Sequence, residues 1–112
     1  EVGVGCSIMT GAVITSDVII GEGTLINLNC TVGHDSRIGA FCDLSPGVHV
    51  SGRVTVGDYC SIGTGAVLLP RVKIGRNVVV GAGAVVTKDI DSDSLVVGVP
   101  GKVVRKLPPV QA

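Results

Sequence analysis

The chain contains no tryptophan, one phenylalanine and one tyrosine among its 112 residues. A core without aromatic rings is filled by aliphatic side chains. No stretch approaches the roughly 18 apolar residues that span a membrane, and no signal-peptide pattern is visible. The net formal charge is zero. The weak basic cluster at Lys102, Arg105 and Lys106 is too small to indicate a nucleic acid partner.

What the chain does have is an aliphatic residue at every sixth position. The fifteen positions are Val2, Ile8, Ile14, Ile20, Ile26, Val32, Ile38, Leu44, Val50, Val56, Ile62, Leu68, Ile74, Val80 and Val86. A fixed hexapeptide period is typical of a parallel β-helix, in which each hexad supplies a short strand and a turn. Three hexads make one triangular coil, so the hexads of residues 2–91 predict five coils. An antiparallel sandwich would need a period of two and irregular turn spacing instead.

The period also predicts which side chains point into the prism. The aliphatic residue should point inward, because only a large apolar group fills the interior of the triangle. The residue four places later should be small, because it lies where the wall bends. Glycine directly follows the aliphatic residue in many hexads, which indicates either unusual φ/ψ angles or a close approach of the backbone. These glycines are Gly3, Gly21, Gly33, Gly39, Gly57, Gly63, Gly75 and Gly81.

All four cysteines occupy the small inward position, at Cys6, Cys30, Cys42 and Cys60. Their spacings resemble no zinc motif. Cys42 and Cys60 are one coil apart, so a disulfide between them is conceivable. We favour free, buried thiols in a reducing cytoplasm, and we therefore expect a cytoplasmic protein.

The period divides the chain into a β-helix at residues 1–91 and a tail at residues 92–112. Within the tail, Leu95 to Val99 reads as a strand, Pro100-Gly101 as a turn, and Val103 to Leu107 as a brief helix or strand. We expect this tail to pack on the last coil. The repeat begins in frame at Val2 without a cap, and open coil edges are normally covered. We therefore expect either further residues upstream or a partner subunit at that edge.

A small prism is also expected to associate with other copies. Its core is modest against the conformational entropy lost on folding. Outward-facing aliphatic residues would supply a second apolar surface shared between subunits. These residues are Leu28, Val67, Leu69, Val79 and Val85.

His34 is the strongest catalytic candidate. It lies on the outer wall, and a neutral imidazole is suited to accept a proton near neutral pH. Asp35 follows it and can orient the ring. One coil after His34 stands Gly52, which leaves room for a substrate and exposes a backbone N–H. The alternative interpretation is a solvent-exposed His–Asp pair without catalytic function.

The remaining aromatic and histidine side chains carry weaker signals. His49 also lies on the outer wall, and we interpret it as a surface residue. A carbonic anhydrase of the hexapeptide type would need three histidine ligands for zinc, so we expect no metal. Phe41 and Tyr59 are one coil apart and should stack, either at a subunit contact or in an acceptor pocket, or simply as a local ladder.

The segment Val32-Gly33-His34-Asp35-Ser36-Arg37-Ile38-Gly39, continued to Gly47 and followed by Val50-Ser51-Gly52, carries a family resemblance. It resembles the sialic-acid O-acetyltransferase group of bacterial sugar O- and N-acyltransferases, within the left-handed β-helix acyltransferase superfamily. The run Val86-Thr87-Lys88-Asp89 with Val97-Gly98-Val99-Pro100-Gly101-Lys102 is similar to the C-terminal tail common in that superfamily.

This resemblance implies a left-handed coil and a homotrimer that binds acetyl-coenzyme A between neighbouring prisms. It implies that His34 deprotonates a sugar amine or hydroxyl, that Asp35 holds the imidazole, and that the Gly52 amide binds the developing oxyanion. The amides of Thr64 and Ala82 would run along the pantetheine, and Lys102 would also contact the coenzyme. The acceptor would attack the thioester directly, without a covalent enzyme intermediate.

Two departures from the family pattern stand out. Some relatives carry a second histidine nine residues after the base, where this chain has Asp43. Full-length relatives also carry an N-terminal nucleotide-binding domain, which we expect to be missing from this chain. Two alternatives remain open: another acyltransferase of the superfamily, such as a serine acetyltransferase, and a non-catalytic trimeric assembly module.

Overall fold

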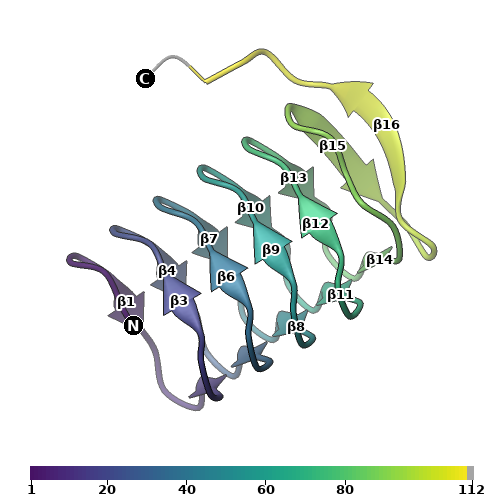
Figure 1. Ribbon diagram of the computed structural model, residues 1–112. Helices are drawn as coiled ribbons and strands as arrows, with labels where there is room; N and C mark the ends of the chain where they lie inside the picture. The colour runs from purple at the N-terminus through teal and green to yellow at the C-terminus, as the bar shows by residue number, and fades with distance from the viewer. Residues whose placement is uncertain (111–112) are drawn as a thin grey trace.

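The computed structural model describes residues 1–110, and within them it contains strands but no helix. Two-residue strands recur at every hexad from β1 to β14, and two longer strands, β15 and β16, follow. Figure 1 shows the strands stacked coil upon coil along one axis, with the N-terminus at one end and β16 at the other. The predicted all-β parallel β-helix of five coils is therefore confirmed.

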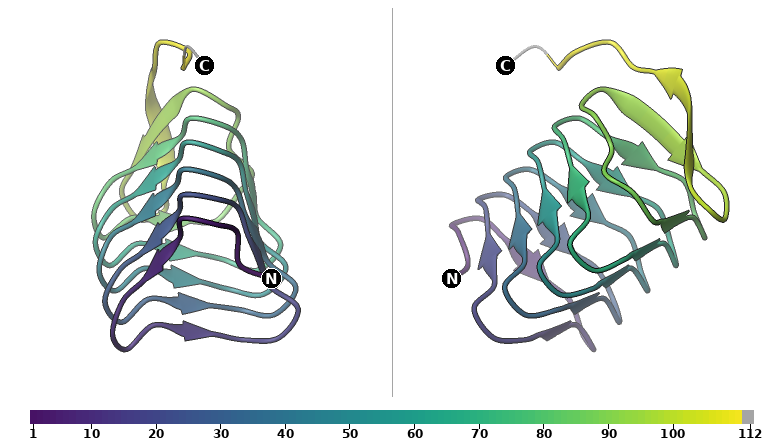
Figure 2. Two further views of the ribbon diagram at one scale, coloured as in Figure 1. Left: turned by 90° about the vertical axis from the view of Figure 1, so that its left-hand side faces the viewer. Right: turned by 45° about the vertical axis from the view of Figure 1, so that its right-hand side comes forward.

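The strands form the three faces of a triangular prism, which is seen along the stack in Figure 2. The first face contains β1 (Ser7–Ile8), β4 (Leu25–Ile26), β7 (Asp43–Leu44), β10 (Ser61–Ile62), β13 (Val79–Val80), β15 (Ser94–Val97) and β16 (Lys102–Lys106). The second face contains β2 (Val13–Ile14), β5 (Thr31–Val32), β8 (His49–Val50), β11 (Val67–Leu68) and β14 (Val85–Val86). The third face contains β3 (Ile19–Ile20), β6 (Arg37–Ile38), β9 (Thr55–Val56) and β12 (Lys73–Ile74).

Residues one coil apart pair in register, as Leu44 pairs with Ile62 on the first face. The same register holds on the other two faces. The turns therefore also stack into three corners. We call the corner between the second and third faces the His34 corner. The corner between the first and second faces is the Thr64 corner, and the corner between the third and first faces is the Phe41 corner.

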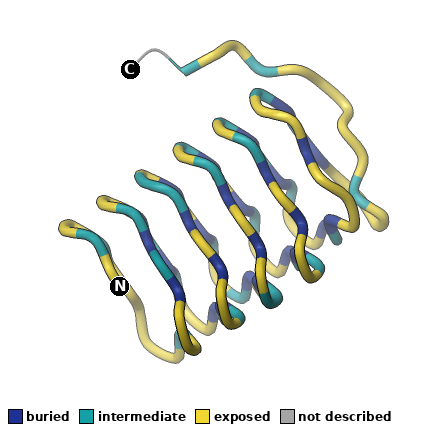
Figure 3. The backbone as a smooth tube through the Cα atoms, in the orientation of Figure 1, coloured by how far each residue is buried: buried dark blue, intermediate teal, exposed yellow. Residues whose placement is uncertain are grey.

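The core is the inward column predicted from the sequence. Every inward aliphatic residue from Ile20 to Val86 is buried. In the first coil, Val2 is 50% exposed and Ile8 is 42% exposed, because within residues 1–110 this coil has a neighbouring coil on one side alone. Figure 3 shows the alternation of buried and exposed residues along the strands.

Where the small inward residue is cysteine, threonine or serine, its side chain donates a hydrogen bond as well as filling space. Thr24 Oγ1 donates to the carbonyl of Gly39 at 2.7 Å, and Cys42 Sγ donates to the carbonyl of Gly57 at 3.1 Å. Cys60 Sγ makes the same contact with Gly75. All four cysteines are free. The Cys42 thiol together with burial raises the pKa of Cys60 far above its usual value, so this thiol stays protonated and unreactive.

The glycines that follow the aliphatic residues serve close approach. None of them has a positive φ. A Cβ at Gly57 would lie 2.6 Å from the carbonyl carbon of Gly75 in the next coil. Left-handed backbone occurs instead at the third residue after the aliphatic position, in fourteen turns. Glycine, aspartate or asparagine holds this position in ten of them, and Phe41, Arg53, Tyr59 and Arg71 hold the other four.

The tail continues the first face. β15 pairs in parallel with β13, and β16 pairs antiparallel with β15. The segment predicted as a helix or strand at Val103 to Leu107 is a strand, with bounds Lys102–Lys106. The Lys106 ammonium donates to Ser94 Oγ at 2.9 Å across this hairpin. Among the described residues, no helix long and apolar enough to cross a membrane occurs.

Gly57→Ala should destabilise the protein by at least about 2 kcal/mol, because its new methyl group meets the backbone of the next coil and strands on both sides prevent relaxation. Ser45→Ala is the matched control, since Ser45 holds the same place in its hexad and already carries a Cβ. Urea unfolding followed by circular dichroism measures both. Equal midpoints for the two variants would contradict the close-approach explanation.

Candidate functional site

The His34 corner brings His34, Gly52 and Pro70 into one column across three coils. The Arg53 amide donates to the carbonyl of His34 at 2.8 Å, and the Arg71 amide donates to the carbonyl of Gly52 at 3.1 Å. These bonds fix the spacing between successive coils at this corner. The predicted stacking of His34 on Gly52 is therefore present in the structure.

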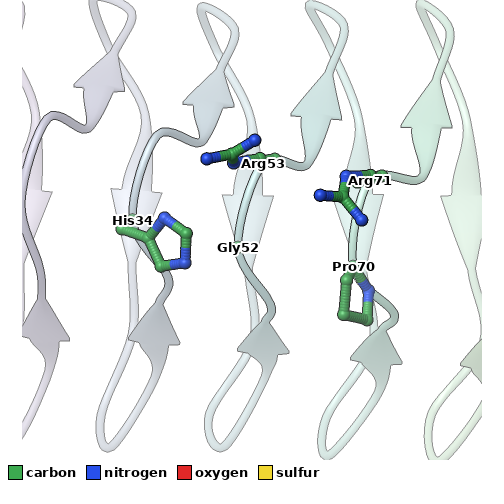
Figure 4. Close-up of a pocket in the computed structure, with 5 residues that line it drawn as sticks. All are labelled: His34, Gly52, Arg53, Pro70 and Arg71. Carbon is green, nitrogen blue, oxygen red and sulfur yellow. The ribbon is translucent and has the colours of Figure 1, made fainter.

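His34 is oriented by its sequence neighbour. Nδ1 of His34 lies 2.9 Å from Oδ2 of Asp35. An ionised carboxylate only accepts hydrogen bonds, so Nδ1 carries the proton and Nε2 keeps its lone pair. A Cβ on Gly52 would lie 2.7 Å from that Nε2. The basic nitrogen thus faces Gly52, and glycine is what makes room for the ring (Figure 4).

The amide of Gly52 is available to a ligand. Among residues 1–110 it donates to no backbone or side-chain acceptor. Gly33 contributes to this, since a Cβ there would lie 2.6 Å from the Gly52 nitrogen. A side chain at position 33 would therefore cover the amide that the glycine leaves open.

Ser36 holds the same peptide group from inside the prism. Its buried Oγ donates to the carbonyl of Ser51 at 2.9 Å and accepts from the amide of Val54 at 3.1 Å. The Ser51 carbonyl and the Gly52 N–H belong to one peptide unit. A hydrogen bond to the carbonyl fixes that unit and polarises its N–H. The sequence pattern marked Ser36 only as a small inward residue.

An open pocket of about 280 Å³ lies over this corner. Its lining residues are His34, Gly52, Arg53, Pro70 and Arg71. Sequence reasoning found the first two and missed both arginines. The signal was available, because stepping by whole coils from Asp35 gives Arg53 and then Arg71. Figure 4 shows the Arg53 guanidinium between His34 and Gly52, and the Arg71 guanidinium next to Pro70 on the following coil.

The other predicted coenzyme contacts lie elsewhere on the protomer. Thr64 and Ala82 stack on the Thr64 corner, across the second face from His34. Their amides also donate to no backbone acceptor among the described residues. Lys102 is an exposed residue at the start of β16, and Asp43 points outward on the first face. One protomer therefore groups His34, Asp35 and Gly52, and separates them from Thr64, Ala82 and Lys102.

The two weaker candidates are also placed. His49 is exposed on the second face, and its Nδ1 lies 2.8 Å from Thr31 Oγ1. Phe41 and Tyr59 stack as predicted, with ring centroids 5.6 Å apart. Arg76 lies over Tyr59. This aromatic pair is on the Phe41 corner and so does not line the pocket at His34. No group of three or more potential metal ligands occurs among residues 1–110.

Taken together, the corner offers an oriented imidazole base, a free backbone N–H one coil away, and two cations beside them. Such a set can remove a proton from a nucleophile and stabilise a negative oxygen on an acyl group.

Comparisons with known proteins agree with this architecture. Residues 53–88 match the family described as bacterial transferase hexapeptide (six repeats). A variant of perosamine N-acetyltransferase from Caulobacter crescentus, solved with CoA and GDP-perosamine, is 35% identical, with a TM-score of 0.83 over 90% of this chain and 52% of that chain. The acetyltransferase domain of PglB from Neisseria gonorrhoeae with acetyl coenzyme A is 33% identical, with a TM-score of 0.73 over 93% and 55%.

Serine acetyltransferase from Neisseria gonorrhoeae is 28% identical, with a TM-score of 0.84 over 89% of this chain and 43% of that chain. A search of curated protein sequences finds no significant match. The chain spans about half the length of the first two solved relatives. Its hexapeptide repeats and its solved relatives are those of the left-handed β-helix acyltransferase superfamily, and these repeats also imply the left hand of the coil.

Gly52→Ala should displace the His34 ring while the protein stays folded. The three heavy atoms nearest to the new methyl group all belong to the His34 ring, which can move. NMR of the histidine side chains should show a large change in the His34 signals and little change in those of His49. Unchanged His34 signals would contradict the packing of this ring on Gly52.

Proposed function

We propose that the protein is an acetyl-CoA-dependent acetyltransferase that acylates an amino or hydroxyl group of a sugar. The observation that carries the proposal is the His34 Nε2 facing the open Gly52 amide, with Nδ1 anchored on Asp35. The solved relatives that hold CoA and GDP-perosamine support the donor and the acceptor class. The acceptor is an amino-sugar nucleotide or a sialic-acid-like sugar, and the setting is sugar biosynthesis in the cytoplasm.

In the proposed reaction, His34 acts as the general base. Nε2 removes the proton from the acceptor amine or hydroxyl as this group attacks the thioester carbonyl. The Asp35 carboxylate keeps Nδ1 protonated and stabilises the imidazolium that forms. The proton then passes from Nε2 to the departing thiolate of CoA. No side chain of the corner needs to form a covalent bond with the acetyl group.

The Gly52 amide takes the second role. It binds the thioester carbonyl oxygen and stabilises the negative charge that develops there. The hydrogen bond from Ser36 to the carbonyl of Ser51 preorganises this donor before the substrate arrives. The chain fits a thioester at this point because the amide is unpaired and the pocket above it is open.

Assembly completes the proposed site. The Gly52 amide and the amides of Thr64 and Ala82 lie on two corners of one protomer. A cyclic trimer brings different surfaces of neighbouring copies together. We place the His34 corner of one protomer against the Thr64 corner of the next. The pantetheine then lies in the groove between them, and Lys102 would contact the coenzyme near the end of the prism.

His34→Ala is expected to lower kcat by about 10²–10⁴-fold and to change acetyl-CoA binding little, because it removes the base and leaves the amides. Asp35→Asn should have a smaller effect, since the base remains. The release of free CoA thiol is measured with amino-sugar nucleotides, amino sugars, sialic acids and serine as acceptors. His49→Ala is the control and should retain turnover.

Near-normal turnover by His34→Ala would overturn the mechanism. Transfer to serine alone would favour a serine acetyltransferase. The absence of transfer from the wild-type protein to any acceptor, with the trimer intact, would favour the non-catalytic assembly module.

Light scattering coupled to gel filtration should return three times the chain mass of 11.3 kDa. Leu28 and Val13 are exposed apolar residues that a neighbouring copy would cover. The amides proposed to bind the coenzyme also lie on two different corners of one protomer, so a second protomer is needed to bring them together. A single monomeric peak at micromolar concentration would contradict the shared groove.

A further inference from the structure

Two arginines at the His34 corner occupy a backbone conformation that disfavours them. Arg53 has φ = 59° and Arg71 has φ = 66°. Left-handed backbone is costly for residues with a Cβ, and glycine, asparagine and aspartate tolerate it best. Ten of the fourteen equivalent turns use those three residue types. Unfavourable conformations that persist next to a pocket indicate a function for the side chain.

Neither arginine is neutralised within the described chain. The one ion pair among residues 1–110 is that between His34 and Asp35. Asp89, which lies one coil after Arg71 in the sequence, uses its carboxylate to accept from the Lys73 amide. Two like charges therefore line one pocket without a partner, and an anion placed between them would relieve their repulsion. A guanidinium group binds carboxylate and phosphate oxygens with two parallel hydrogen bonds.

We infer that Arg53 and Arg71 bind an anionic group of the acyl acceptor, a carboxylate or a phosphate, close to the group that is acetylated. This inference rests on the proposed acetyltransferase function. It assigns the anion to the acceptor because the arginines line the same pocket as His34 and Gly52, where the reacting atoms meet. The phosphates of CoA are separated from its thioester by the whole pantetheine arm, which carries them away from this pocket.

The backbone fixes the relation between the two subsites. The Arg53 amide is bonded to the His34 carbonyl, and the Arg71 amide is bonded to the Gly52 carbonyl. Each arginine is thereby tied to one residue of the proposed machinery. An acceptor held by its anion would present its amine or hydroxyl to Nε2 of His34. Affinity for the anionic group would thus be used to orient the nucleophile.

The first experiment compares acceptors that differ in charge. Wild-type protein, Arg53→Gln and Arg71→Gln are assayed with glucosamine 1-phosphate, N-acetylneuraminate and neutral glucosamine. Each variant should lower kcat/KM for the charged acceptor that the wild type prefers by about 10- to 100-fold, mainly through KM. Turnover of glucosamine should change much less, and Arg105→Gln in β16 serves as the charge-matched control. Preference for the phosphate or for the carboxylate identifies the source of the anion.

The second experiment does not depend on turnover. Inorganic phosphate and acetate are titrated separately into protein with labelled histidines. The His34 signals should shift saturably with at least one of the two anions and the His49 signals should not, because His49 does not line the pocket. Arg53→Gly and Arg71→Gly should weaken this binding at least tenfold, yet unfold at the same or a higher temperature, since glycine suits their backbone angles.

The outcomes separate the two proposals. If anions bind saturably and this binding requires the arginines, but no acceptor is acetylated, the anion site is supported and the acetyltransferase function is refuted. If the arginine variants change acetyl transfer to charged and to neutral acceptors by the same factor, the anion site is refuted and the acetyltransferase function is supported. The inference is also overturned if neither anion shifts His34, or if the glycine variants bind the anions as the wild type does.

Discussion

The structure depends on the register between coils. Each strand pairs with the strand one coil later, and both neighbours are held by backbone hydrogen bonds. This register turns a sequence period into columns of equivalent residues, so that a single substitution is felt by the coils on either side. It explains why glycine recurs where the backbone of the next coil comes close, and why inward donors such as Thr24 and Cys42 reach a carbonyl of the following coil.

The same register assembles the candidate site without any loop or helix. His34 and Gly52 come together because they are one coil apart, and Asp35 fixes the imidazole through a local hydrogen bond. Ser36 then holds the peptide that carries the Gly52 amide. A corner is a suitable place for such chemistry because its amides do not all belong to the strand pairing. The rigid prism keeps base and amide at a constant separation, which a flexible loop would not.

Much of this could be predicted from the sequence because an exact period leaves little freedom. The period placed the inward column, the five coils, the Phe41–Tyr59 stack and the His34–Gly52 pair. It did not show that the glycines after the aliphatic residues serve close approach, since φ cannot be read from spacing. The spacing also places Arg53 and Arg71 one and two coils after Asp35, but that they adopt left-handed backbone and line the pocket is seen only in the structure. The relation of Thr64 and Ala82 to the base depends on neighbouring copies and stays a proposal.

The most direct measurement is a crystal structure of the protein with bound acetyl-CoA. We expect the thioester carbonyl oxygen to lie about 3 Å from the Gly52 nitrogen, with the open face of the carbonyl toward His34 Nε2. We also expect the pantetheine to pass the amides of Thr64 and Ala82 on a neighbouring protomer. A coenzyme bound away from the His34 corner, or a thioester oxygen held by groups other than the Gly52 amide, would contradict the proposed site.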